Sequence, residues 1–509
     1  MDLVKSIWHR FSRLAALLLL SLTSRRTASI VLFGLVLLSF LSLALPPAPS
    51  GPSDRVPMWA GRFFWTGVNY PWKSYQDFGT GPWGHSGISD STTYAEVDTD
   101  FANMAAQGIR IVKWRVFNDG RYSPEFDQSG YVTGLDDKFF ADIDAALQIA
   151  QKHDVYLILS LFSSGFWVTD CWQNGVHIGG HADTITAPAK RRSLIQNAVI
   201  PLIQHVSHSD RVLAYEVLAE PEWGIRELNQ DSDYRIKVPL DSARDFALEL
   251  TRAVHLNSHA LATVEANRAR NLSAWRGLGL DYYSFSWYDW LEPYDPLNVP
   301  ASSYSLDRPI VLGEFPVAQN PYYRLPDVLD IALRQGYAGA FAWSYLGGDK
   351  YGQLSNGSRA FRDWTRQHWS LVSLLGAAPP PENVQLQSPP YSTGKVQLGL
   401  AGNSVLVNLQ VSIRQDGEYN VQVVLHPIGG GDQKFQQMPI QAGSNRLVSV
   451  TFNGLAEGKP YRLDVGVFDQ NWQLKKWFQG VASLEVKGQT LQEPQLSPEA
   501  SENACYSGQ

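Results

Sequence analysis

The sequence predicts an α/β fold: a (β/α)8 TIM barrel followed by a small all-β sandwich domain, with an N-terminal membrane anchor. Three observations lead to this prediction. Between residues 61 and 375, eight short apolar runs alternate with amphipathic segments, which matches the repeat number of a (β/α)8 barrel. From about residue 395 the pattern changes to alternating apolar and polar residues, which is typical of a sandwich. A mostly apolar stretch lies near the N-terminus.

That N-terminal stretch covers residues 28–45. Residues 1–27 before it are rich in Lys and Arg, and a proline-rich linker, residues 46–60, follows. The basic flank predicts a cytoplasmic N-terminus and an exported remainder. Two alternatives stay open: an uncleaved signal anchor, which the long basic segment favours, and a signal peptide cleaved near Ala44. We therefore expect a single-pass protein of the cell membrane with its barrel outside the cytoplasm, or a secreted protein if the segment is cleaved.

The barrel prediction depends on runs that are apolar on both faces, as buried parallel strands are. The eight candidate strands are residues 64–69, 109–117, 156–161, 213–218, 261–266, 282–287, 310–313 and 338–343. The clearest amphipathic segments between them are residues 94–107, 136–153, 190–205 and 241–257, and these predict helices. The interval between the fifth and sixth strands is short, so its helix should be abbreviated.

The C-terminal part begins with a proline-rich linker, residues 376–394. Residues 395–488 alternate between apolar and polar side chains and carry glycine-rich turns, which predicts the β-sandwich. Residues 489–509 are polar and are expected to be disordered. Trp472 and Trp477 are the candidates for exposed aromatic rings, but no aromatic row stands out, so a structural role is favoured over carbohydrate binding.

Composition narrows the possible partners. The chain has 509 residues, a formal net charge of −7 and 18% charged residues, so nothing points to nucleic acid. No cofactor is expected, and we expect a monomer. The two cysteines, Cys171 and Cys505, lie in distant regions, so no disulfide framework is expected.

Two of the predicted strands end in a glutamate. Glu220 follows the fourth strand and Glu314 follows the seventh. The carboxyl ends of barrel strands form one face, where such folds carry their chemistry. Two carboxyl groups roughly 5–5.5 Å apart can cleave a glycosidic bond with retention: one attacks the sugar, and the other protonates the leaving oxygen and then activates water. The pair therefore predicts a carbohydrate substrate.

Several segments resemble one known family. Residues 215–223, Tyr-Glu-Val-Leu-Ala-Glu-Pro-Glu-Trp, resemble the Trp-Asp-x-x-Asn-Glu-Pro motif of cellulase-type retaining glycoside hydrolases, that is, glycoside hydrolase family five and its relatives. Residues 311–315, Val-Leu-Gly-Glu-Phe, resemble the nucleophile strand of that family. Residues 67–70, 108–117, 281–288 and 339–345 resemble its first, second, sixth and eighth strands. The resemblance implies that Glu220 is the acid/base, that Glu314 is the nucleophile, and that the substrate is a β-linked poly- or oligosaccharide.

The resemblance also implies substrate-binding residues. Tyr288 matches the tyrosine that hydrogen-bonds the nucleophile, and Trp343 matches the tryptophan beneath the sugar at the cleaved bond. Asn69, at the end of the first strand, is expected to bond a sugar hydroxyl. Trp223 is expected to line a cleft, and further candidates for this role are Trp72, Trp83, Trp167 and Trp287.

Three positions depart from the family pattern. Ala219 replaces the asparagine that bonds the substrate 2-hydroxyl, and Ser286 replaces a histidine. The family arginine of the second strand aligns with Lys113, with Arg115 two residues further on the same face. Either the substrate differs at its 2-position, or catalysis is impaired or lost. A non-catalytic glycan-binding protein and an envelope transglycosylase therefore remain alternatives to a hydrolase.

The remaining candidate metal ligands and two further glutamates are not assigned to the active-site chemistry. Cys171, His177, His181 and Asp183 lie at short spacing, but the two consecutive glycines among them indicate a flexible loop. We expect this loop to be solvated or to contact substrate, and we predict no metal site. Two further glutamates are not assigned to catalysis. We expect the Glu216 side chain to form a pair inside the barrel. We expect Glu222 to lie in the loop, at its rim.

Overall fold

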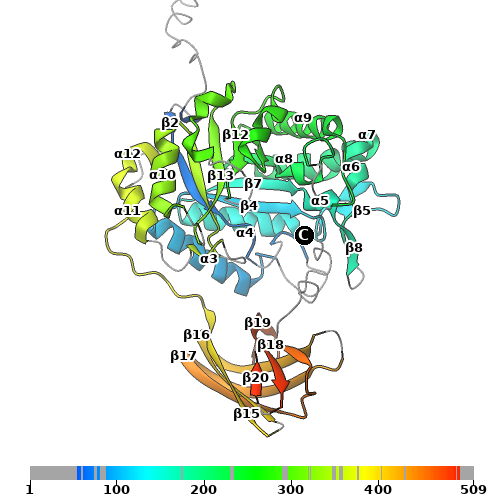
Figure 1. The fold of residues 1–509 in the computed structure, drawn as a ribbon, viewed down its shortest axis with the longest axis vertical. Helices are drawn as coiled ribbons and strands as arrows, with labels where there is room; N and C mark the ends of the chain where they lie inside the picture. Colours follow the sequence, from blue (N-terminus) through cyan, green and yellow to red (C-terminus); the bar gives the residue numbers. More distant parts are fainter. Residues whose placement is uncertain are drawn as a thin grey trace, which may run out of the picture. The chain divides into compact units, whose positions relative to one another are not determined.

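The computed structural model describes residues 54–58, 61–73, 77–80, 87–173, 176–229, 234–288, 296–318, 320, 322–346, 351–354, 359–374, 378–402, 404–428, 431–488 and 490–492 (Figure 1). The predicted membrane segment, most of the predicted disordered tail and Trp83 lie outside these residues. Within these ranges, no helix is both long enough and apolar enough to cross a membrane.

Eight parallel strands close into a barrel, and each corresponds to one of the eight predicted runs. In barrel order they are β10 (Val212–Ala219), β11 (Leu261–Ala266), β12 (Tyr283–Ser286), β13 (Ile310–Pro316), β14 (Gly339–Trp343), β3 (Trp65–Asn69), β4 (Ile111–Asn118) and β7 (Tyr156–Ser163). Each strand pairs in parallel with its neighbours. The TIM-barrel prediction is confirmed.

Helices connect the barrel strands. The predicted helices correspond to α3 (Ser91–Ala106), α4 (Phe139–Lys152), the continuous run of α7 (Pro188–Leu194), the π-helical turn η1 (Ile195–Val199) and α8 (Ile200–Val206), and α9 (Leu240–Asn257). In the described part of the chain, the remaining α-helices are α5 (Gly165–Val168), α6 (Ala182–Thr186), α10 (Leu325–Arg334), α11 (Arg359–Gln367) and α12 (Trp369–Val372). Between β11 and β12 the chain has room only for the 3-10 helix η3 (Ala269–Trp275), as the short interval predicts.

Shorter elements complete the barrel. Besides η3, the 3-10 helices among the described residues are η2 (Pro221–Gly224), η4 (Pro296–Asn298) and η5 (Ala301–Tyr304). Antiparallel pairs join β1 (Val56–Met58) to β2 (Gly61–Phe63), β5 (Glu125–Phe126) to β6 (Val132–Gly134), and β8 (Asp170–Gln173) to β9 (Val176–Gly179).

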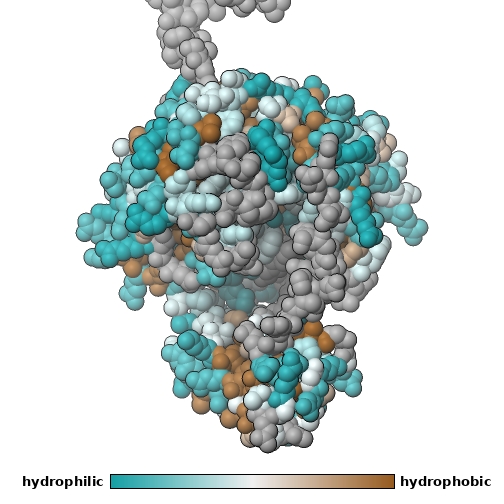
Figure 2. Space-filling view, in the orientation of Figure 1, coloured by the Kyte–Doolittle hydropathy of each residue, from teal (hydrophilic) through white to brown (hydrophobic). Residues whose placement is uncertain are grey.

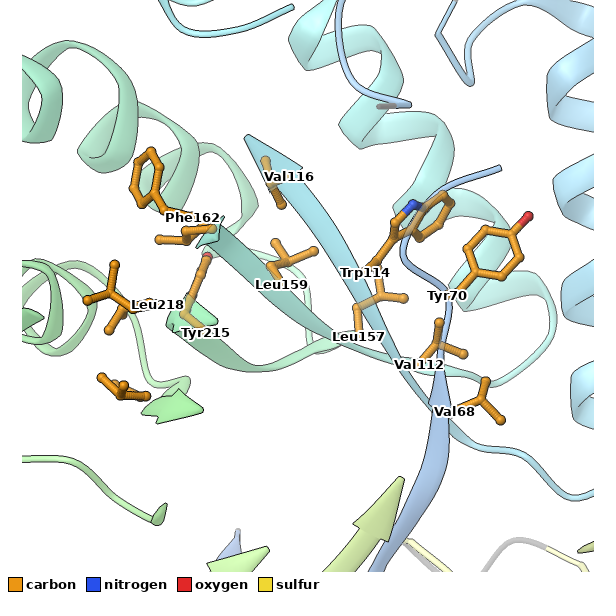
Figure 3. Close-up of a cluster of buried hydrophobic side chains, with 14 of the residues drawn as sticks. Val68, Tyr70, Val112, Trp114, Val116, Leu157, Leu159, Phe162, Tyr215 and Leu218 are labelled. Carbon is orange, nitrogen blue, oxygen red and sulfur yellow. The ribbon is translucent and has the colours of Figure 1, made fainter. Parts of the chain in front are cut away.

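Strand β4 shows how the two-residue period of a strand places its side chains. Val112, Trp114 and Val116 belong to the large cluster of buried apolar residues shared with the helices (Figure 3). Ile111, on the opposite face, belongs to a separate apolar cluster contributed by several barrel strands. Successive side chains point to opposite faces of a strand, so Lys113 follows Ile111 on the inner face. The sequence therefore directs a buried cation into the barrel.

The C-terminal part is all-β, as predicted. Its strands are β15 (Tyr391–Ala401), β16 (Ser404–Pro427), β17 (Lys434–Asn453), β18 (Pro460–Asp469), β19 (Leu474–Lys487) and β20 (Thr490–Gln492). All neighbouring strands pair antiparallel. Alternating residues of β16, such as Val405, Val407 and Val423, are fully buried in a core of their own. In the view of Figure 2, hydrophilic residues predominate on the described surface of the barrel.

Candidate active site

Glu314 lies in β13, every residue of which is buried. The Tyr288 hydroxyl donates a hydrogen bond to its Oε2 at 3.1 Å. Its Oε1 lies 3.6 Å from Lys113 Nζ and 3.8 Å from Arg115 Nη2. Burial raises the pKa of Glu314 to about 7, and the charges of Lys113 and Arg115 oppose that rise. Two cations and a hydroxyl donor therefore favour the ionised carboxylate in a site that otherwise disfavours charge.

Glu220 follows β10 and begins the turn into η2. Its backbone is left-handed, with φ 48° and ψ 47°, a conformation that non-glycine residues rarely adopt and that is often found at functional sites. Its amide donates to the Glu265 carbonyl at 2.8 Å, which fixes the turn to β11. The Trp223 indole Nε1 donates to Glu220 Oε2 at 3.0 Å. The strained turn and this tryptophan together orient the carboxylate.

The two glutamates share one electrostatic environment. The charge of Glu220 contributes to raising the pKa of Glu314. Both carboxylates also act on the Arg115 guanidinium and help to raise its pKa against the effect of burial. The ends of strands four and seven therefore bring their carboxylates to the same region, as the sequence predicts.

Lys113 is the centre of a buried ionic cluster beneath these carboxylates. Its Nζ lies 3.1 Å from Glu216 Oε2 and 2.5 Å from Glu265 Oε2. Burial alone would lower the pKa of Lys113, but the neighbouring carboxylates outweigh it and raise the pKa. The Ser160 hydroxyl completes the cluster by donating to Glu216 Oε1 at 2.7 Å. The expected pairing of Glu216 inside the barrel is confirmed.

Glu265 is a site residue that the sequence analysis missed. It is fully buried and lies opposite Ala219 in the β10–β11 register. Burial first, and then the Glu216 charge, raise its pKa well above the usual range, although Lys113 opposes the rise. Its Oε1 is buried without a hydrogen-bond partner among the described residues. The available signal was a single glutamate within the otherwise uncharged run 261–266.

The expectation that Glu222 lies at the rim is wrong. This residue is fully buried, and its carboxylate accepts hydrogen bonds from the Asn267 amide at 2.8 Å and from Trp275 Nε1 at 2.6 Å. Burial raises its pKa to about 7. Glu222 thus fastens η2, and with it the Glu220 turn, to the segment that follows β11.

The predicted substrate-binding residues take different positions. Asn69 is buried, and its Nδ2 donates to the carbonyls of Gly313 at 3.0 Å and Ala342 at 3.3 Å. Asn69 therefore holds β13 and β14 together, and a contact with a sugar stays a prediction. Ser286 is also fully buried, and its Oγ has no hydrogen-bond partner among the described residues.

Of the aromatic candidates, Trp343 is the best placed. It is partly exposed. The Arg115 guanidinium lies 5.3 Å from the centroid of the Trp343 ring and 5.6 Å from that of Trp72, within the range of cation–π attraction. Trp167 and Trp287 are fully buried, so the expectation that they line a cleft is wrong.

The side chains of the candidate metal ligands Cys171, His177 and His181 make other contacts. The distance between the two cysteines predicts no disulfide framework, but Cys171 is disulfide-bonded. The other cysteine in the sequence, Cys505, lies outside the described residues. His177 Nε2 lies 2.8 Å from Asp170 Oδ1. His181 is buried and stacks on Phe126 with 3.9 Å between ring centroids, and burial lowers its pKa to about 4. In the described part of the chain, no group of three or more potential ligands is arranged to hold a metal ion.

Comparison with known proteins finds similarity to mannan endo-1,4-beta-mannosidases. No protein-family model matches the chain. The mannan endo-1,4-beta-mannosidase of Cryptopygus antarcticus is 25% identical over 369 residues, which cover 63% of this chain and 92% of that protein. The Mytilus edulis enzyme of the same name is 22% identical over 320 residues, covering 55% and 83%.

Solved structures agree on the fold. The Aplysia kurodai β-1,4-mannanase aligns with a TM-score of 0.52 and 21% identity, over 64% of this chain and 97% of that one. The Eisenia fetida endo-1,4-beta-mannanase aligns with a TM-score of 0.51 and 24% identity, over 59% and 90%. The chain is a glycoside hydrolase similar to the cellulase-type retaining enzymes.

A retaining glycoside hydrolase needs one carboxylate in its ionised form, and the surroundings of Glu314 favour it for that state. Because Arg115 lowers the pKa of Glu314, we expect Arg115→Gln to raise it above 7. Only the carboxylate attacks, so kcat/KM should fall as the pH drops through this pKa. The acid limb of the kcat/KM profile, which reports the free enzyme, should move to higher pH by about one unit. Arg192→Gln, an exposed change of the same charge, should leave the limb in place; identical shifts in both variants would refute the assignment.

Proposed function

We propose that this hydrolase cleaves the internal β-1,4 linkages of mannan, with Glu314 as the nucleophile and Glu220 as the acid/base. The single observation that carries the residue assignment is the environment of Glu314, which lies between Tyr288, Lys113 and Arg115 with Glu220 nearby. The substrate is suggested by the two relatives, both of which are mannan endo-1,4-beta-mannosidases.

The first step of the proposed mechanism forms a covalent intermediate. A carboxylate oxygen of Glu314 attacks the anomeric carbon and forms a C–O bond to it. The bond from that carbon to the leaving sugar oxygen breaks, and the proton of Glu220 passes to this oxygen. The leaving sugar departs with a free hydroxyl, and Glu220 becomes a carboxylate.

The second step reverses these roles. Glu220 removes a proton from water, the water oxygen bonds to the anomeric carbon, and Glu314 leaves as a carboxylate. Two inversions give net retention. Trp223 keeps Glu220 oriented through both steps, while the hydrogen bond from Tyr288 favours the charge on Glu314 before attack and after release.

The surrounding residues would shape sugar binding. Trp343 is partly exposed and fixed by Arg115, so it offers an aromatic face for the sugar at the cleaved bond. The side chain of Ala219 has no hydrogen-bonding group, and the Ser286 hydroxyl is buried. Neither of these two side chains is therefore assigned a hydrogen bond to the 2-hydroxyl of the substrate.

The nucleophile and acid/base roles make separable predictions. Glu314→Ala should abolish hydrolysis of mannan and of aryl β-mannosides. Glu220→Ala should slow mannan hydrolysis by about 10²–10⁴-fold, but should affect aryl mannosides with good leaving groups less, because these need no protonation. Glu125→Gln, an exposed change, is the control. Reducing-sugar release and chromophore release measure the two substrates; wild-type rates in Glu314→Ala would remove it from catalysis.

We also propose that the enzyme works outside the cytoplasm, attached by residues 28–45 or secreted after cleavage, and that residues 395–488 form a sandwich. Disulfide-bonded Cys171 supports an oxidising compartment. The six described strands belong to one sheet. The interruption in β16–β17 pairing between Ile413 and Glu418 supports a fold of this sheet into two layers. Both halves of β16 pair with β17, but the first half also pairs with β15 and the second with β18.

Fractionation of cells that express the full chain tests the location. Activity should sediment with membranes or appear in the medium. A variant lacking residues 1–45 should remain in the cytoplasm with Cys171 reduced. Cytoplasmic activity from the full chain would contradict the proposal.

A further inference from the structure

A short antiparallel hairpin, β8–β9, carries a highly exposed indole. Trp172 is 70% exposed, the largest value among the exposed aromatic residues in the described part of the chain. Its ring stacks on the imidazole of His177, with 4.7 Å between centroids and 6° between planes. His177 Nε2 in turn lies 2.8 Å from Asp170 Oδ1. The indole is therefore held flat on one side, while most of its surface meets solvent.

The hairpin is fastened to the loops that follow three neighbouring barrel strands. The Gly179 amide donates to the Asp119 carbonyl, just beyond β4, at 2.9 Å. The Gly180 amide donates to the Thr169 carbonyl, beyond β7, at 2.5 Å. Gly179 has φ 69°, and a Cβ there would lie 2.2 Å from the Thr169 carbonyl oxygen. Only glycine fits this close approach.

The third attachment leads toward Glu220. Trp167, in α5 before the hairpin, donates from Nε1 to the Gly224 carbonyl of η2 at 3.0 Å. The same turn carries Trp223, which bonds Glu220. The exposed ring is therefore mounted on the face of the barrel where the strands end and where Glu220 and Glu314 lie.

Hydrophobic packing does not explain why a tryptophan stands at position 172, because its ring is mostly exposed and contributes little to any core. The indole face opposite the stacked imidazole is flat and apolar, and it matches the face of a pyranose, which presents C–H groups. We propose that Trp172 is the platform of a distal subsite that binds a sugar unit of the polysaccharide away from the cleaved bond. This inference rests on the proposed function only in taking a polysaccharide as the substrate.

Kinetics on long and short substrates test the proposal in the full chain. Trp172→Ala should raise KM for mannan by about tenfold, as expected for the loss of one stacking contact. It should leave kcat on mannan and kcat/KM on aryl β-mannosides unchanged, since a single sugar does not reach the subsite. Trp172→Phe, which keeps a ring, should restore most of the affinity. Trp472→Ala is the matched control, because it removes a 46% exposed indole from the C-terminal all-β part. It should leave the KM for mannan unchanged.

Binding without turnover separates this proposal from the proposed function. In gels containing galactomannan, glucomannan or cellulose derivatives, the Glu314→Ala protein should be retarded by at least one polymer, and adding Trp172→Ala should abolish most of that retardation. If the wild-type enzyme fails to cleave mannan, the substrate proposal falls while this comparison still holds. Equal retardation with and without Trp172, no retardation by any polymer, or equal losses on polymer and aryl substrate would overturn the subsite.

Discussion

The site depends on the buried contact between Lys113 and the carboxylates around it. Lys113 lies within 3.6 Å of Glu216, Glu265 and Glu314. With Arg115 it faces four glutamates, Glu220 included, so the cations do not balance the carboxylates if all are ionised. Burial magnifies this imbalance, and together with the charge of Glu216 it raises the pKa of Glu265 well above the usual range. Loss of Lys113 would leave buried carboxylates unpaired, which is strongly destabilising.

Because Lys113 is shared among several carboxylates, it stabilises the negative charge of Glu314 less than an unshared lysine would. Lys113 Nζ is closer to Glu265, at 2.5 Å, than to Glu314, at 3.6 Å. A lysine is a compact charge that several acceptors can share, whereas an arginine fork engages one carboxylate at two points. The lysine thus links the interior of the barrel to the catalytic face, and Arg115, between Trp72 and Trp343, supplies the second charge near Glu314.

The sequence predicts the barrel and its two carboxylates well because both follow local patterns. Runs that are apolar on both faces mark the strands. A glutamate at the end of such a run can be recognised without knowing which distant residues it contacts. Glu265 and Glu222 were missed or misplaced because their roles depend on residues far away in sequence, Lys113 for one and Trp275 for the other. The disulfide bond of Cys171 is likewise not evident from the sequence, because the other cysteine, Cys505, lies far away along the chain.

The central claim is that Glu314 forms the covalent bond to the sugar. A 2-deoxy-2-fluoro mannoside with an activated leaving group slows the second step more than the first, so the intermediate accumulates. After incubation with the wild-type enzyme, peptide mass spectrometry should find one fluorosugar on the peptide that contains Glu314, and none on the Glu314→Ala protein. Attachment to Glu220 or Glu265 would contradict the account, as would turnover of the reagent without any labelled peptide.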